Sequence, residues 1–263
     1  MFSYVFMQNA LLGILVLTPL LALIGTIVVN NKMAFFSDAI GHSALTGVGF
    51  GVLLGLGINN IAIAVFSAIL AIIITILKLN QNSNTETIIS IVSSISVALG
   101  IVILSINGSF AKYTSYIIGD ILSITKNEIF TMFIVFLVVG ILIYYIYNKL
   151  VLISINSTLA KSRGINVVVY ELIFSIIVAV VVALSIKWVG VLVINSLIVI
   201  PCATSRIISS NIKQYIIYSI LISLISGIAG LVISYTIDAS SAATIVLVNG
   251  TIYMLVRLFN RTK

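Results

Sequence analysis

The sequence predicts an all-α polytopic membrane protein with about eight or nine transmembrane helices and a short re-entrant or interfacial segment. Hydrophobic residues make up 61 % of the 263 positions and charged residues only 7 %. A soluble domain has about 25 % charged residues, which cover its surface. The few charges also gather in short islands between long apolar runs. These observations exclude an ordinary soluble fold.

The long apolar runs have the length of membrane-spanning helices. A bilayer core about 30 Å thick requires roughly 20 residues at helical rise, and a helix satisfies its own backbone groups in lipid. Barrel strands would show alternating faces over about ten residues, which these runs lack. We expect one transmembrane domain over residues 1–263, with spans near 9–29, 38–57, 61–79, 86–105, 129–149, 168–187, 190–209, 213–236 and 240–257.

Two segments need a separate interpretation. Residues 112–124 are too short and too polar for an ordinary span, so we expect a re-entrant or interfacial piece there. The first span lacks the charged n-region and cleavage site of a removable signal peptide. We therefore expect it in the mature chain.

Lysine and arginine indicate the topology. They collect in the loop 149–166 and in the tail after residue 256, and both should be cytoplasmic by the positive-inside rule. Four expected helices between them return the chain to the same side. The formal charge of +7 then reflects topology and contact with anionic lipid, and no basic helix with interleaved aromatic residues suggests a nucleic-acid partner. The single cysteine, Cys202, excludes an internal disulfide and a multi-cysteine metal cluster.

Small residues recur at four-residue spacing, which favours close helix packing in membranes. Gly47, Gly51 and Gly55 form one such series. Ser223 with Gly227, and Ser226 with Gly230, repeat the spacing on a later helix. We expect both helices to contact protein rather than lipid.

Asp38 and His42, the only histidine, form the most informative pair of polar residues. Positions i and i+4 share one helix face, so the carboxylate and the imidazole can converge on one point. An ionisable group in a membrane segment needs a partner or water. Three interpretations stay open: a structural helix start, a proton relay, and a ligand pair for a divalent metal such as zinc or manganese. Asp238 is the candidate third ligand, with a helix cap as its alternative.

The sequence lacks the motifs of the intramembrane proteases and of the phosphate-loop ATPases. It contains no H-E-x-x-H, its IIGD (117–120) lacks the first glycine of G-x-G-D, and it has no G-x-x-x-x-G-K-[ST] phosphate loop. We expect a protein that is not an enzyme and needs a separate subunit for any ATP hydrolysis. Glu86 is expected to cap a helix, and Asp120 to serve a structural hydrogen bond. Gly190 and Pro201 predict a kinked or broken helix near a pathway, or a simple proline kink.

Four stretches of the chain resemble one family. In the same order and nearly end to end, they are similar to the membrane permease of bacterial ABC importers for zinc, manganese or iron. The specific pair of blocks is D-x-x-x-H-x-x-x-x-G together with N-x-L-x-x-x-P, here Asn195, Leu197 and Pro201. The four stretches are MAFFSDAIGHSALTGVGFG (33–51), YIIGDIL (116–122), VGVLVINSLIVIPCATSRIIS (189–209) and SYTIDASSAATIVLV (234–248).

The resemblance implies a type II ABC importer permease fold and a set of partners. These are a second copy of the chain in a homodimer, two cytoplasmic ATP-binding cassette subunits that carry ATP, and an extracytoplasmic metal-binding protein. It also implies that Asp38 and His42 lie on the metal pathway, with Asn195 and Pro201 on a pathway helix. No permanently bound cofactor is expected. The transported ion would be zinc or manganese, with iron as a further candidate.

The family also has a cytoplasmic coupling helix with an A-x-x-x-G core. Ala160 and Gly164 match it in the loop of about 150–167, and we include Arg163 in the ATPase contact. Such a helix can sit in a cleft of the ATPase and pass its closure to the membrane. The alternative is an ordinary polar connector.

This chain departs from the family pattern in three places. Asn156 and Thr158 stand where acidic residues are usual, and Ser240 and Ala242 where proline and glycine are usual. Cys202 replaces a small apolar residue, and we interpret it as a buried small hydrophobe.

The function expected from the sequence is the permease subunit of an ATP-driven divalent metal importer in the cytoplasmic membrane. Its C-terminus would be cytoplasmic. The alternatives are a proton-coupled secondary transporter and an intramembrane hydrolase. Three observations separate these functions. Transport by the importer would depend on a partner ATPase, transport by the secondary transporter would depend on a proton gradient, and the hydrolase would turn over substrate as the purified chain alone.

Overall fold

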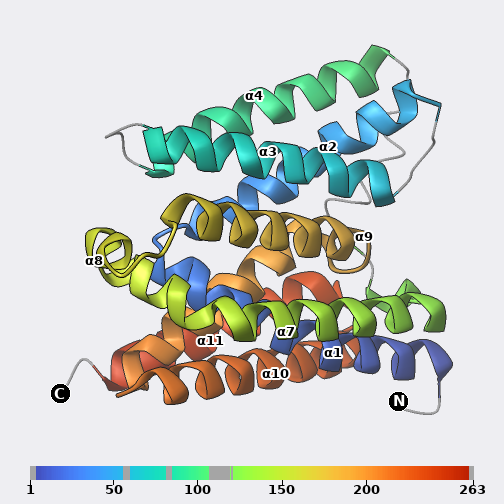
Figure 1. The fold of residues 1–263 in the computed structure, drawn as a ribbon. Coiled ribbons are helices and arrows are strands. Elements are labelled where there is room, and N and C mark those ends of the chain that lie inside the picture. The colour runs from blue at the N-terminus through green and yellow to red at the C-terminus, as the bar shows by residue number, and fades with distance from the viewer. Residues whose placement is uncertain (1–3, 56–59, 81–84, 107–118, 120, 261–263) are drawn as a thin grey trace. The chain divides into compact units, whose positions relative to one another are not determined.

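The structure is a computed structural model that describes residues 4–55, 60–80, 85–106, 119 and 121–260. All regular secondary structure in these residues is helical, as the sequence predicts (Figure 1). The elements are α1 (Val5–Asn30), α2 (Ala34–Leu53), α3 (Asn60–Asn80), α4 (Thr85–Ile106), the 3₁₀ turn η1 (Ile121–Ser123), α7 (Lys126–Ile155), α8 (Ser157–Ser162), α9 (Val167–Ile208), α10 (Ile212–Ile237) and α11 (Ser241–Phe259).

Seven of the described helices are long and apolar enough to cross a membrane: α1, α3, α4, α7, α9, α10 and α11. The predicted count of eight or nine differs at two places. The expected spans 168–187 and 190–209 both lie in α9, where two helices join across the non-helical backbone of Gly190, so the predicted division is present although the two helices count as one element. The expected span 38–57 corresponds to α2, which is not one of the seven. Most of the segment 112–124 lies outside the described residues.

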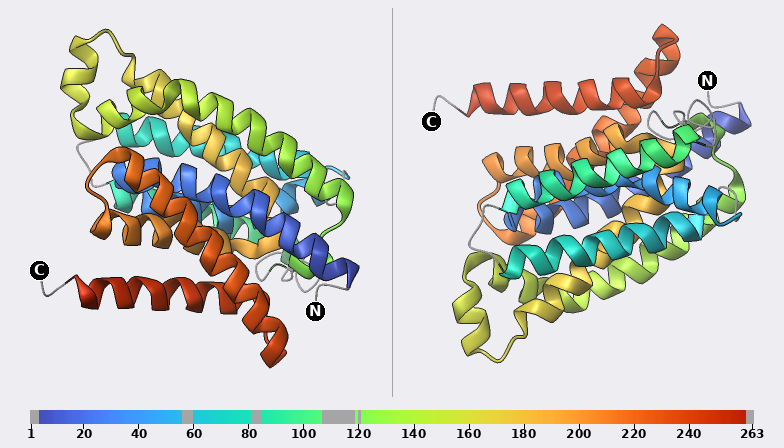
Figure 2. Two further views of the ribbon diagram at one scale, coloured as in Figure 1. Left: turned by 90° about the horizontal axis from the view of Figure 1, so that it is seen from below. Right: turned by 90° about the horizontal axis from the view of Figure 1, so that it is seen from above.

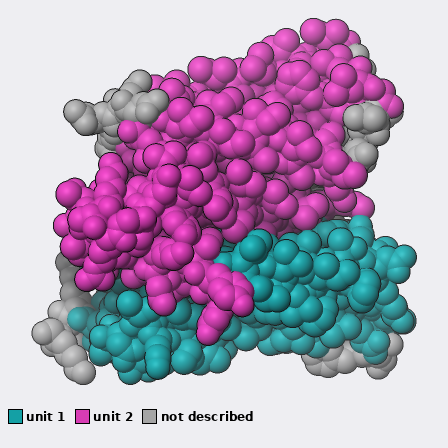
Figure 3. All heavy atoms as spheres, viewed as in Figure 1, with its two compact units in different colours: residues 1–29, 118–143, 188–263 teal, residues 30–117, 144–187 magenta. Residues whose placement is uncertain are grey.

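The chain falls into two compact units, coloured separately in Figure 3. Unit 1 comprises residues 1–29, 118–143 and 188–263, and unit 2 comprises residues 30–117 and 144–187. Each unit is described by itself below. The single transmembrane domain over 1–263 stays a prediction.

In unit 1, α10 packs on α1 and on α11 through small residues. The hydroxyl of Ser223 donates to the backbone oxygen of Thr18 at 3.2 Å. A Cβ at Gly227 would lie 2.8 Å from Ile14 Cγ2, and one at Gly230 would lie 2.6 Å from the Cα of Ile245. The second small-residue series therefore lies at helix contacts. The chain reverses between α10 and α11, as Figure 2 shows.

The break in α9 is at Gly190, where φ is 77° and ψ is 159°. This conformation is essentially restricted to glycine. A Cβ at Gly119, itself at φ 70°, would collide with the backbone of Gly190. Pro201 is buried inside α9 and no non-helical dihedral accompanies it. The glycine pair, rather than the proline, therefore interrupts the helix.

In unit 2, α2 packs against both α3 and α4 (Figure 1). A Cβ at Gly47 would lie 3.0 Å from the Cα of Ile63 on α3. Facing α4, the hydroxyl of Thr46 hydrogen-bonds the backbone oxygen of Ser96, and a Cβ at Gly100 would lie 2.6 to 2.9 Å from atoms of Thr46. These contacts hold α2 within protein, as the glycine series predicts for Gly47.

The other two glycines of that series differ from each other. Gly51 is buried in the last turns of α2. Gly55 lies beyond the end of the helix at φ 70°, with open space where a Cβ would be. Its role is a left-handed turn, so the three glycines do not form one helix face.

The longest uninterrupted helix is α7, with 30 residues. At 1.5 Å per residue it is about 45 Å long, well above the roughly 30 Å of a bilayer core. Tyr144 and Tyr145 are 80 % and 74 % exposed, and they lie about 27 Å along the helix from Lys126. Exposed tyrosines at this depth are typical of a membrane interface.

Candidate functional site

Asp38 and His42 lie on the second and third turns of α2. The helix begins at Ala34, and Met33 precedes it without a side-chain cap. His42 Nε2 is 3.5 Å from Asp38 Oδ1, and the side chains are 42 % and 36 % exposed, respectively. The pair therefore converges as the i, i+4 spacing predicts, and it remains accessible. Asp38 lies one turn past the helix start, so the N-terminal dipole acts on it only weakly.

The separation of the two atoms suits a shared metal ion. Two ligand atoms about 2.0–2.2 Å from a tetrahedral zinc ion lie roughly 3.4 Å apart. The observed 3.5 Å between Nε2 and Oδ1 is close to that value. An ion could thus bind both groups with little movement of α2.

A cavity of about 460 Å³ opens beside Asp38, between α2 and the first turns of α4. Its wall is partly apolar, and hydroxyl groups and two carboxylates supply its polar part. Its lining residues are Phe35, Asp38, Ala39, Glu86, Thr87, Ile89, Ser90, Ile91, Ser93 and Ser94. Carboxylate and hydroxyl oxygens are suitable partners for a partly hydrated divalent cation.

Glu86 is a cavity residue that the sequence alone does not identify. It lies in the first turn of α4 and is exposed. The capping role expected for it stays a prediction. Its place opposite Asp38 depends on the packing of α4 against α2, which no local pattern encodes. The one feature of the sequence that could have drawn attention to Glu86 was an acidic residue next to a long apolar run.

No three histidine, cysteine, aspartate or glutamate side chains gather into a metal-holding group in the part of the chain that the structure describes. Asp38 and His42 could therefore supply two ligands to an ion, and Glu86 lines the cavity without completing a group of three. Two ligands hold an ion weakly. Weak binding is what a site that must release its ion requires.

Asp238 belongs to unit 1, where it ends α10 in a left-handed conformation with φ 50°. Its N–H donates to the backbone oxygen of Ser234, and the residue is exposed. Aspartate is among the few residues that tolerate this conformation. Ser240 then begins α11 as its N-cap, which gives this departure from the family pattern a local role.

Asn195 and Pro201 lie on the C-terminal part of α9 in unit 1. Asn195 is half-buried, and its neighbour Ser196 accepts a hydrogen bond from Asn249 of α11 at 3.3 Å. Cys202 is fully buried and lies 3.3 Å from the backbone oxygen of Ala22. The cysteine packs as the small hydrophobe that we expected.

The segment that the family resemblance leads us to expect in the ATPase contact forms a defined short helix. Asn156 caps α8, because its Oδ1 accepts from the N–H of Leu159 at 3.0 Å. Ala160 is fully buried and packs in a cluster with Ile153 and Val167. Gly164 has φ 76° and follows the helix as its left-handed terminator. The A-x-x-x-G core thus shapes the segment, and its exposed surface comes from other residues.

Arg163 and Lys161 are both exposed in this segment, as are Ser157, Thr158 and Leu159. An acidic residue is a good N-cap, and asparagine is an equally good one. The substitution at Asn156 therefore keeps the cap while it removes a negative charge. Asp120 lies outside the described residues.

A buried ion pair in unit 2 was not predicted from the sequence. Glu171 in α9 lies 2.9 Å from Lys78 Nζ in α3, and their side chains are 10 % and 15 % exposed, respectively. An acid inside the expected span 168–187 was a usable signal, because such groups need partners. Its partner, 93 residues away, was not predictable.

Comparisons with known proteins agree with this architecture. The profile of the ABC 3 transport family matches residues 3–260. The chain is 32 % identical to the high-affinity zinc uptake system membrane protein ZnuB of Haemophilus influenzae over 255 residues, which cover 97 % of each chain. It is 28 % identical over 250 residues to the manganese import system permease protein ScaB of Streptococcus gordonii, covering 95 % of this chain and 90 % of ScaB.

Two solved structures share the fold. PsaBC from Streptococcus pneumoniae in complex with Fab matches with a TM-score of 0.84 at 28 % identity, over 97 % of this chain and 91 % of the other. An inward-facing putative metal-chelate type ABC transporter matches with a TM-score of 0.71 at 14 % identity, over 96 % and 85 % of the two chains. The predicted resemblance to metal-uptake permeases is confirmed. This chain belongs to the ABC 3 transport family.

Proposed function

We propose that this chain is the membrane permease subunit of an ATP-driven importer for a divalent transition metal, zinc or manganese. Two copies form the translocation pathway, separate cytoplasmic subunits hydrolyse ATP, and an extracytoplasmic protein delivers the ion. The observation that carries the proposal is the accessible Asp38–His42 pair, with 3.5 Å between its ligand atoms. The zinc and manganese permeases among its relatives support the class of cargo.

In the proposed mechanism, Asp38 and His42 replace part of the hydration shell of the ion. The cavity beside them holds the remaining water against hydroxyl groups and Glu86. Because only two protein ligands are fixed, the ion leaves when α2 moves. Closure of the ATPase subunits provides that movement through the coupling segment around α8, with the C-terminus on the same cytoplasmic side.

The proposal also gives a role on the metal pathway to Asn195, Pro201 and Asp238. Asn195 is a polar group on the proposed pathway helix, and Pro201 frees a carbonyl one turn earlier. Asp238 is an exposed carboxylate at the end of α10 and a candidate further contact for the ion. These assignments rest on the family resemblance rather than on geometry.

The test is ATP-dependent uptake of zinc and of manganese into vesicles that carry the chain with its cognate ATPase and binding protein. Asp38→Ala and His42→Ala should assemble and hydrolyse ATP, yet lose uptake by about 100-fold, because the loss of a direct ligand should cost at least as much as the roughly 10–100-fold loss seen for outer-shell partners. Glu128→Ala is the matched control, because this half-buried carboxylate lies in the first turn of α7 and accepts hydrogen bonds from the backbone N–H and the hydroxyl of Thr125.

The same assay separates the other classes of function. Uptake that persists with an inactive ATPase and follows a proton gradient would identify a secondary transporter. Normal uptake by both alanine variants would remove the Asp38–His42 pair from the pathway. The metal that accumulates with the wild-type chain identifies the cargo.

A further inference from the structure

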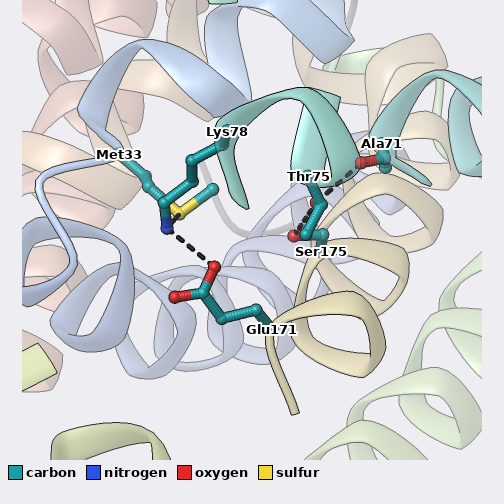
Figure 4. A network of polar contacts seen from close by, with 6 residues as sticks. All are labelled: Met33, Ala71, Thr75, Lys78, Glu171 and Ser175. Carbon is teal, nitrogen blue, oxygen red and sulfur yellow. Dashed lines mark hydrogen bonds and ion pairs between the residues drawn. The ribbon is translucent and has the colours of Figure 1, made fainter. Parts of the chain in front are cut away.

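Lys78 and Glu171 form a buried ion pair within unit 2. Among the residues that the structure describes, Glu171 is the one charged residue that is buried, with 8 % of the whole residue exposed. Its Oε2 lies 2.9 Å from Lys78 Nζ, which also approaches Met33 Sδ at 3.5 Å (Figure 4). A buried pair of this kind is weak support for stability, because desolvation opposes the attraction. A role beyond stability is therefore worth testing.

A second polar contact lies beside the pair on the same two helices. Thr75 Oγ1 is 2.8 Å from Ser175 Oγ and 2.7 Å from the backbone oxygen of Ala71 (Figure 4). Thr75 precedes Lys78 by three residues, and Ser175 follows Glu171 by four, so the two contacts are successive on one helix face. They fix α3 against the first turns of α9 in one register.

The first turns of α9 are attached to α8. Val167 shares the cluster of Ala160 and Ile153, with Tyr170 packed against it. Lys149 of α7 donates to the Tyr170 hydroxyl and lies 4.7 Å from the centre of its ring. A displacement of α8 must therefore carry the start of α9, and Glu171 with it.

The other end of the contact leads to α2. Met33 is buried and directly precedes α2, with Asp38 five residues further along. Lys78 thus lies between the start of α9 and the start of the helix that carries Asp38 and His42. Apolar surfaces in a membrane slide past one another at low cost, whereas a short buried ion pair resists separation.

We propose that Lys78 and Glu171 are a positioning pair that transmits displacement of α8 to α2, and so to Asp38 and His42. This inference rests on the proposed function. The Lys78–Glu171 pair does not contact the ion. Its role is to couple closure of the ATPase subunits to movement of Asp38 and His42.

The test uses variants that keep packing but change charge. Lys78→Met with Glu171→Leu removes the pair and leaves apolar volume, which preserves the fold in many proteins. Lys78→Glu with Glu171→Lys reverses the pair and should restore function. Lys213→Met is the matched control, because Lys213 is an exposed residue of α10. Thermal unfolding in detergent checks that every variant is folded.

The first readout is the number of ions taken up per ATP hydrolysed, in vesicles with the full transporter. The double apolar variant should give a ratio about fivefold lower, within the range by which residues between two sites alter their coupling. The charge-reversed variant and Lys213→Met should keep the wild-type ratio. A purely structural pair would lower assembly and leave the ratio unchanged, and that outcome overturns the inference.

The second readout is independent of the cargo. Phe35→Cys places a thiol on the first turn of α2, next to Asp38, while the natural Cys202 is fully buried. Its rate of maleimide labelling should change when the ATPase subunits bind ATP, and the double apolar variant should abolish that change. An equal response in the double apolar variant, or none with the native pair, overturns the inference. A response with the native pair and no uptake of either metal contradicts the proposed function alone.

Discussion

Two helix contacts in this protein both use serine, threonine and glycine residues, but only one of them opens into a cavity with charged side chains. The α1–α10 contact uses Ser223, Gly227 and Thr18, and α1 contributes no charged side chain. The α2–α4 contact uses Thr46, Ser96 and Gly100, but at its start it opens into the cavity with Asp38 and Glu86. Small residues and hydroxyls therefore account for packing in both. The two contacts differ in charge, because Asp38 and Glu86 line the cavity at the start of the α2–α4 contact.

The largest expected effect comes from closing the space within the α2–α4 contact. Gly100→Val should lower the free energy of unfolding by about 3 kcal/mol, the upper part of the range for overpacking. The reason is that its Cβ would lie 2.8 and 2.9 Å from backbone atoms of Thr46, which cannot rotate away. Thermal unfolding in detergent measures the change.

Gly140→Ala is the control for this substitution. A Cβ at Gly140 meets nothing within 4 Å, and alanine is a better helix former by about 1 kcal/mol. A loss of stability in Gly140→Ala as large as that in Gly100→Val would mean that the α2–α4 contact has no special role.

A smaller effect is expected from the charge that distinguishes the two contacts. Glu86→Gln should reduce metal uptake roughly tenfold, the low end of what a charged cleft adds to local ion concentration. Its unfolding temperature should stay within the error of the wild type. A capping role alone would give the reverse pattern, with normal uptake and a slightly lower unfolding temperature.

The smallest effect is expected in the α1–α10 contact. Ser223→Ala removes a 3.2 Å hydrogen bond to a backbone oxygen. Such interhelical bonds in membranes average about 0.6 kcal/mol, so uptake should be normal and stability nearly so. Loss of transport in this variant would show that both contacts, and not just α2–α4, take part in the cycle.

Local patterns predicted most of the helices and the convergence of Asp38 with His42. Apolar length fixed the helices, and helical periodicity fixed a pair four residues apart. The division at Gly190 agrees with the expected end of one span at 187 and start of the next at 190, but its contact with Gly119, 71 residues away, was not predictable from a local pattern. The contribution of Glu86 to the cavity and the partner of Glu171 depend in the same way on packing between distant helices.

The length of α7 has a consequence for the lipid around the protein. If Tyr144 and Tyr145 stay at the interface, about ten further residues of α7 lie outside the hydrocarbon core, between the membrane and α8. A thicker bilayer would take up part of this end of α7 or reduce the tilt of the helix. The distance of α8 from the membrane surface would then vary with the acyl-chain length of the host membrane, although the sequence is unchanged.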